Sequence, residues 1–186
     1  MRRRMLLGVL ILIPALMVLQ IALSVSGTAA NRTARATIRD TAGAEVGTAK
    51  LVQKRDGTVE VRIDTDGLAP GFHGFHVHAV GICDAAASFT SAGGHFNPTG
   101  HVHGHHAGDL PLLYVDANGV GWARFTSDSF AVADLLDADG SALIIHADPD
   151  NYANIPTRYA AAGPDATTLA TGDAGGRVAC GVLQAR

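Results

Sequence analysis

Histidine is concentrated in one stretch of this chain, residues 71–109, which reads GFHGFHVHAVGICDAAASFTSAGGHFNPTGHVHGHHAGD. Eight of the nine histidines fall inside it: His73, His76, His78, His95, His101, His103, His105 and His106. The ninth, His146, ends a separate apolar run, ALIIH. Imidazole is the commonest protein ligand for zinc and copper, so this clustering predicts a metal centre that the rest of the chain must position.

The first pair of candidate ligands is His76 and His78. They are two residues apart in a segment with strand character, so both should project from one face and converge on one ion. Phe75 and Val77 then point toward a core. His73 falls on the opposite face from the pair, and we expect it to be a buried, hydrogen-bonded packing residue. The alternative for His76 and His78 is a pair of exposed surface histidines.

A second group of candidates occupies residues 95–109, HFNPTGHVHGHHAGD. Asp109 follows His106 by three residues, and three imidazoles with one carboxylate form a reasonable tetrahedral zinc shell. Turns at Asn97-Pro98 and Gly100 allow the chain to fold back on itself. The alternative is a flexible histidine-rich tract that binds metals loosely.

Three further polar residues lie outside this stretch. His146 follows an apolar strand, and a lone histidine in that position is usually structural. Asp150, four residues later, is placed to orient a metal ligand by a hydrogen bond. Arg177 precedes the last apolar segment, and by position alone it is a solvated or capping arginine.

The N-terminal segment predicts export. Three arginines precede an almost wholly apolar run over residues 5–25, and small residues follow it up to residue 30. This order is typical of a signal peptide, although the run also approaches the length of a membrane anchor. The domain boundaries are therefore 1–30 for a signal peptide or anchor and 31–186 for the folded domain. In an exported protein, Cys83 and Cys180, the only cysteines, are expected to form a disulfide.

Composition limits the class of protein. Three of the 14 basic residues lie in 1–30, which leaves 11 against 17 acidic residues and a formal charge of −6 for the remainder. An acidic domain is a poor candidate for nucleic-acid binding. Alternating apolar and polar residues, separated by turn signals, indicate about eight short strands, as in an antiparallel sandwich or barrel. Residues 129–139 are compatible with a helical turn or a loop, and residues 147–176 with a long loop.

Five motifs, in order, resemble one known family. They are GFHGFHVH, SAGGHFNP, HAGDL, the histidine ending LIIH, and GDAGGRVACGV. Over residues 34–184 the chain is similar to the copper–zinc superoxide dismutases, particularly the exported bacterial type. The resemblance implies an all-β fold, an eight-stranded antiparallel Greek-key barrel with long metal-binding and electrostatic loops.

The resemblance also implies specific roles for residues of this chain. The implied copper ligands are His76, His78, His95 and His146. The implied zinc ligands are His95, His103, His106 and Asp109. His95 then bridges the two metals and relays a proton, Asp150 links a copper ligand to a zinc ligand, and Arg177 guides superoxide. Cys83 and Cys180 match the family disulfide.

The implied activity is the dismutation of superoxide to dioxygen and hydrogen peroxide. An exported copper- or zinc-binding or delivery protein on the same fold is the alternative, and a structural surface domain with an incidental histidine-rich loop is a third. The interval between His103 and His106 is shorter than in many family members, so His101 and His105 stay open as substitute zinc ligands. The loop before Arg177 carries no lysine, so attraction of the anion should depend mainly on Arg177. Whether the protein is a monomer or a dimer is left open.

Overall fold

The computed structural model describes residues 33–186. The strands of this region are β1 Thr33–Asp40, β2 Glu45–Gln53, β3 Val59–Thr65, β4 Gly71–His73, β5 Phe75–His78, β6 Leu113–Val115, β7 Gly121–Ser127, β8 Ala142–His146, β9 Arg177–Val182 and β10 Gln184–Ala185. The helices are short: η1 Ala85–Ala87, η2 Thr90–Ala92, η3 Val132–Leu136 and α1 Thr168–Thr171. The expected signal peptide or anchor, residues 1–30, lies outside the described part of the chain.

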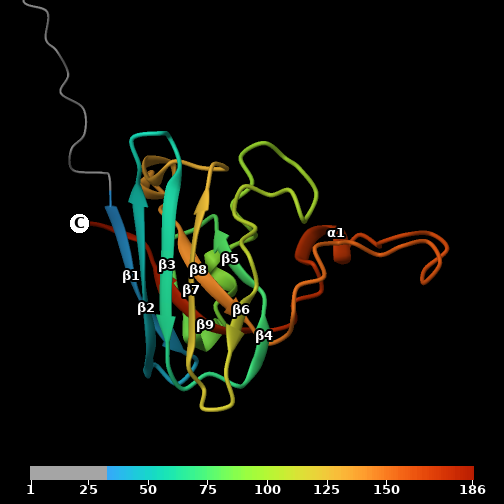
Figure 1. Cartoon of the computed structure of the whole chain (residues 1–186), viewed down its shortest axis with the longest axis horizontal. Coiled ribbons are helices and arrows are strands. Elements are labelled where there is room, and N and C mark those ends of the chain that lie inside the picture. The colour runs from blue at the N-terminus through green and yellow to red at the C-terminus, as the bar shows by residue number, and fades with distance from the viewer. Residues whose placement is uncertain (1–32) are drawn as a thin grey trace, which may run out of the picture.

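The strands form one antiparallel sheet in the order β4-β6-β7-β3-β2-β1-β9-β8-β5, with β10 paired to β1. The two end strands, β4 and β5, are consecutive in the chain, so the sheet curls into a nearly closed barrel (Figure 1). The chain crosses from β3 to β4 and later fills the gap between them with β6 and β7. The expected all-β antiparallel barrel is confirmed.

Alternation of side chains builds the barrel interior. In β1, Ala34, Ala36 and Ile38 are buried and the residues between them face outward. The same period of two recurs in β3, where Val61 and Ile63 are buried. These side chains join one apolar cluster that fills the barrel, and Phe75 and Val77 of β5 belong to it as expected. The opposite face of β5 is thereby left for its two histidines.

The segment that carries His73, His76 and His78 is not one unbroken strand, because the chain breaks at Gly74 into β4 and β5. The Gly74 amide donates to the Asp148 carbonyl, and its own carbonyl accepts from the His146 amide. A Cβ at this position would lie 2.6 Å from the Ala174 Cβ. Glycine therefore lets the loop after β8 pack against the closing point of the barrel.

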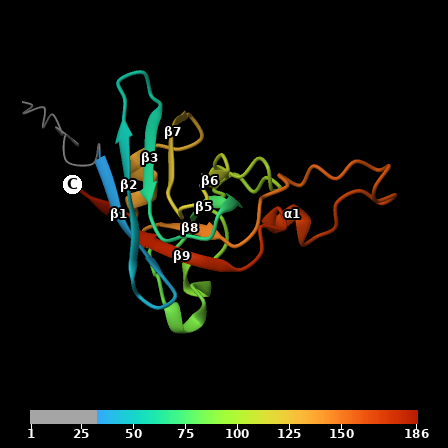
Figure 2. The ribbon, with the colours of Figure 1, turned by 60° about the horizontal axis from the view of Figure 1, so that its bottom comes forward.

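Two long loops project from the barrel and carry most of the remaining chemistry. One runs from β5 to β6 and includes η1 and η2, and the other runs from β8 to β9 and includes α1. Figures 1 and 2 both show the α1 loop extending away from the barrel beside the first loop. The His103 amide donates to the Leu169 carbonyl at 2.8 Å, which ties the two loops together. Within residues 33–186, no helix is long and apolar enough to cross a membrane.

Candidate metal centre

Four imidazoles meet at the edge of the barrel where β5 pairs with β8. His76 and His78 come from β5, His146 ends β8, and His95 arrives from the loop through a bridge to His78. One ring nitrogen from each lies within 4.8 Å of those of the others. His76 and His78 are fully buried, so the surface-histidine alternative is wrong.

Hydrogen bonds fix the orientation of three of these rings. His76 Nε2 donates to Asp150 Oδ2 at 2.6 Å, His78 Nδ1 to the Gly93 carbonyl at 2.9 Å, and His146 Nδ1 to the Gly175 carbonyl at 3.1 Å. The other nitrogen of each ring, His76 Nδ1, His78 Nε2 and His146 Nε2, is buried without a hydrogen-bond partner. Buried polar atoms are seldom left unsatisfied in proteins. Three unsatisfied lone pairs directed at one point therefore fit a copper ion, which accepts imidazole ligands.

A second group shares His95 and consists of His95, His103, His106 and Asp109. His95 Nδ1 lies 3.3 Å from both His103 Nδ1 and His106 Nδ1 and 2.9 Å from Asp109 Oδ1. Asp109 Oδ1 in turn lies 3.3 Å from His103 Nδ1 and 3.2 Å from His106 Nδ1. Ligands placed about 2.0 Å from a tetrahedral zinc ion are about 3.3 Å apart. The separations in this group therefore fit zinc without rearrangement.

Asp150 joins the two groups from behind. Its carboxylate accepts from His76 Nε2 and also from His103 Nε2, at 2.8 Å to Oδ1 and 2.9 Å to Oδ2. The close approach of His76, His103 and Asp150 is thus a hydrogen-bonded bridge, because each ring turns its Nδ1 toward another group. Gly172 has φ of +61°, and a Cβ there would overlap Asp150 Oδ1 and His103 Nε2. Only glycine allows the backbone to cover the bridge this closely.

Burial keeps most of these rings in the form that binds metals. Desolvation lowers the pKa of His76 to about 4, of His78 to about 2 and of His146 to about 3. Burial also opposes protonation of His103, but hydrogen bonds that its ring donates to Asp109 and Asp150 raise its pKa to about 9. The three rings of the four-histidine group are therefore neutral at pH 7, with lone pairs available to an ion.

A pocket of about 560 Å³ opens above the four-histidine group. It is lined by His78, His95 and His146, by Arg177 and by residues of the α1 loop. The Arg177 guanidinium donates to the Phe89 and Gly93 carbonyls, both at 2.6 Å. These bonds fix the cation beside the rings. An anion in the pocket would therefore find a fixed positive charge beside the histidines.

The Cys83–Cys180 disulfide holds this arrangement and confirms the pairing expected from the sequence. It links the loop that contains Phe89 and Gly93 to β9, the strand that begins with Arg177. The disulfide therefore joins the loop that supplies the two carbonyls to the strand that supplies the guanidinium.

The remaining histidines lie outside both groups. His73 is buried, with Nδ1 2.7 Å from the His146 carbonyl and Nε2 2.8 Å from the Ala69 carbonyl, as expected for a packing residue. His101 and His105 are exposed and belong to no group of candidate ligands within residues 33–186. Sequence reasoning missed the orienting carbonyls of Gly93 and Gly175, for which the glycine pairs before His95 and Arg177 were the only signal.

Comparison with known proteins identifies the family. The family model described as copper/zinc superoxide dismutase matches residues 45–183, most of the chain. The chain belongs to the copper/zinc superoxide dismutase family. The family's two metals agree with the two groups of converging ligands described above.

Curated family members include the copper–zinc superoxide dismutases of Mycobacterium tuberculosis and Mycobacterium bovis, each 46% identical over 158 residues. These matches cover 76% of this chain but only 65% of each relative. The enzyme from Mycolicibacterium paratuberculosis is 45% identical over 160 residues, with 77% of this chain and 70% of the relative covered.

Two solved structures share the fold of this chain. A SOD-like protein from Bacillus subtilis superposes with a TM-score of 0.67 at 32% identity, covering 81% of this chain and 97% of that one. The clock protein EA4 superposes with the same TM-score at 30% identity, covering 84% and 96%.

Proposed function

We propose that this protein is an exported enzyme that converts two superoxide anions and two protons into dioxygen and hydrogen peroxide. Three buried imidazole nitrogens without partners, directed at one point at the base of a pocket beside Arg177, carry the proposal. Family membership supports it. The apolar segment at residues 5–25 and the Cys83–Cys180 disulfide favour export, with residues 1–30 acting as a signal peptide or an anchor.

The ligand assignment follows the two groups. The copper ligands are His76, His78, His95 and His146. The zinc ligands are His95, His103, His106 and Asp109. His95 serves both groups, because its Nδ1 faces Asp109 and its Nε2 is left for the copper side. Bound copper would supply one-electron redox chemistry, and bound zinc would supply fixed charge and structural order.

The protein's own side chains prepare the substrate. Arg177 attracts the superoxide anion into the pocket and holds it beside the rings, because its guanidinium is already fixed by two carbonyls. His95 lines the same pocket, and its Nε2 is the atom that can hold a proton and deliver it to the reduced oxygen species. Asp150 keeps His76 and His103 in the tautomers that aim Nδ1 at the ions.

The test is metal content and superoxide-dismutating activity on one purified sample of residues 31–186, loaded with copper and zinc. This fragment contains the whole apolar cluster described above, and nearly all of the SOD-like relative's chain aligns within this chain. One copper and one zinc per chain with rapid turnover supports the proposal. Both metals without activity would instead indicate a metal-binding or delivery protein. Activity with copper alone would contradict the zinc assignment of His103, His106 and Asp109.

A further inference from the structure

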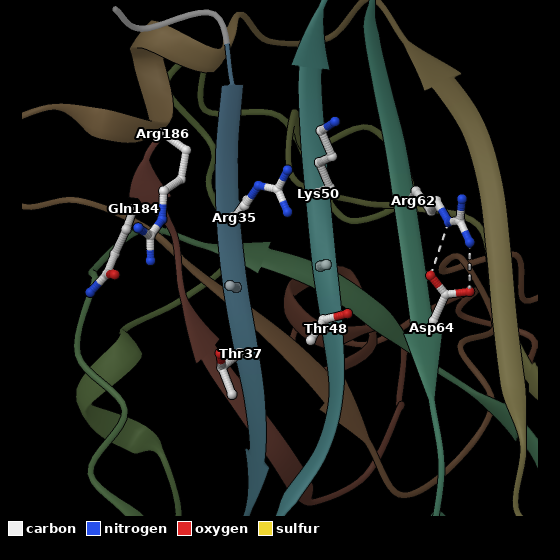
Figure 3. Close-up of a pocket in the computed structure, with 10 residues that line it drawn as sticks. Arg35, Thr37, Thr48, Lys50, Arg62, Asp64, Gln184 and Arg186 are labelled. Carbon is white, nitrogen blue, oxygen red and sulfur yellow. Dashed lines mark hydrogen bonds and ion pairs between the residues drawn. The ribbon is translucent and has the colours of Figure 1, made fainter.

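A row of basic side chains crosses the outer face of the barrel. Arg35 on β1 lies directly opposite Lys50 on β2, and Lys50 lies opposite Arg62 on β3. Arg124 on β7 continues the row opposite Arg62. The residues that flank Arg35, Lys50 and Arg62 along their strands are buried, so these three side chains point outward from adjacent strands (Figure 3). Arg124 is exposed on β7 between two half-buried residues. Neighbouring strands are about 4.8 Å apart, so four like charges are held close together.

Neutralisation of this row is uneven. Arg62 pairs with Asp64 at 2.9 Å, and Arg124 pairs with Glu60 at 2.9 Å. Within residues 33–186, neither Arg35 nor Lys50 forms an ion pair. Like charges directly opposite each other destabilise a sheet. Arg35 and Lys50, which lie opposite each other without ion-pair partners, are therefore available to an external anion.

Three members of the row, Arg35, Lys50 and Arg62, line a groove of about 470 Å³, together with Asp64, the ion-pair partner of Arg62. Thr37, Thr48 and Gln184 supply hydroxyl and amide groups to the same groove, and Arg186 adds another guanidinium (Figure 3). Guanidinium, ammonium and hydroxyl donors together match the oxygens of a phosphate group. Residues 31–186 as a whole carry a formal charge of −6, so this basic face differs from the rest of the domain.

We propose that this basic row binds the phosphate groups of anionic phospholipids and seats the domain on a membrane surface. Arg35 lies two residues after Thr33, where β1 begins. The apolar run ends at residue 25, so at most seven residues separate it from β1, a span of no more than about 25 Å. The row therefore lies within reach of the surface at which that run would enter or leave a bilayer. The remainder of residues 31–186 carries a net negative charge and would be repelled by an anionic surface, which favours this orientation.

This seating leaves the metal centre accessible. None of the residues that line the groove lines the pocket above the four-histidine group. The proposal therefore does not depend on dismutase activity, and failure of one leaves the other standing.

Binding to vesicles tests the proposal with residues 31–186, which lack the apolar run. Vesicles of phosphatidylcholine alone are compared with vesicles containing about one third phosphatidylglycerol, by co-sedimentation at low and physiological salt. Each basic side chain near an anionic surface contributes about a fivefold change in partitioning. R35Q combined with K50Q should therefore lower binding about 25-fold. R39Q combined with R158Q removes the same charge outside the row and is the matched control, expected to change binding by less than about fivefold.

Trp122, the only tryptophan of the chain, provides a second readout. It is 71% exposed, lies opposite Asp64 and stands two residues from Arg124 on the same face. Its emission should shift to the blue with phosphatidylglycerol vesicles and stay unchanged with phosphatidylcholine alone.

Several outcomes would overturn the proposal. Equal binding to both vesicle types, or equal losses in the two double variants, would exclude recognition by the row. Saturation by inorganic phosphate without vesicle binding would identify a free-anion site instead. Sedimentation as a dimer that R35Q with K50Q dissociates would mean that a second copy covers the face.

Discussion

Asp150 offers a sharp test of how one carboxylate serves two metals. Oδ1 accepts from the Tyr152 amide at 2.6 Å and from His103 Nε2 at 2.8 Å, whereas Oδ2 accepts its shortest bond, 2.6 Å, from His76 Nε2. Asp150→Asn keeps the shape but leaves one oxygen. That oxygen should stay with the two donors at the Oδ1 position, so the new amide NH2 faces His76 Nε2. Two donors cannot face each other, and the His76 ring must move its proton to Nδ1.

The expected loss of copper affinity follows from the lone pair of His76 Nδ1, which that proton occupies. His76 Nδ1 is one of the three unpartnered nitrogens of the proposed copper site. Loss of an orienting partner of this kind typically costs a factor of about 10–100 in metal affinity, or about 1.4–2.7 kcal/mol. Copper affinity should fall by this factor, while zinc affinity should change by less because His103 keeps its acceptor.

Competition with chromophoric chelators measures both affinities on the same preparation. Asp148→Asn makes the same chemical change at an exposed carboxylate of the same loop, and it should leave both affinities unchanged. Unchanged copper affinity in Asp150→Asn, or a larger loss of zinc than of copper, would refute the tautomer argument. Circular dichroism excludes misfolding as the cause of any loss.

Three further predictions follow from the same structure. Arg177→Ala should lower kcat/KM at least tenfold and remove most of the dependence of kcat/KM on ionic strength. Arg158→Ala, outside the pocket, should do neither. A steep salt dependence that survives Arg177→Ala would contradict the steering role. Replacing Cys83 and Cys180 by serine removes a link between residues 97 apart, so the free energy of unfolding in guanidinium should fall by up to about 4.7 kcal/mol. Activity should also fall, because the carbonyls that hold Arg177 are no longer fixed. A loss of stability without a loss of activity would show that the loop holds Arg177 without the disulfide. Lys50→Gln should raise the free energy of unfolding by about 0.2–1 kcal/mol, because it relieves repulsion from Arg35 and Arg62. A lower free energy of unfolding would show that repulsion within the basic row does not destabilise the sheet.

Much of the fold was predictable because it depends on local patterns. Alternation of apolar and polar residues over 34–40 and 58–64 predicts strands with one buried face, and β1 and β3 lie there in the structure. The spacing of His76 and His78 predicts one shared face, since side chains alternate along any strand. The break at Gly74 was not predictable, because it depends on Ala174, 100 residues later in the chain, packing against that position.

The sequence by itself determined which residue types were available and where they could share a face, since strand periodicity and turn chemistry are local. Only the tertiary structure decided which nitrogen of each ring is free. Gly93, Gly175 and Asp150 select the tautomers of His78, His146 and His76 across separations of 15 to 74 residues. The same holds for the basic row, because Arg35, Lys50 and Arg62 become neighbours only through strand register. Contacts between distant segments depend on how the barrel closes, and no local pattern encodes that closure.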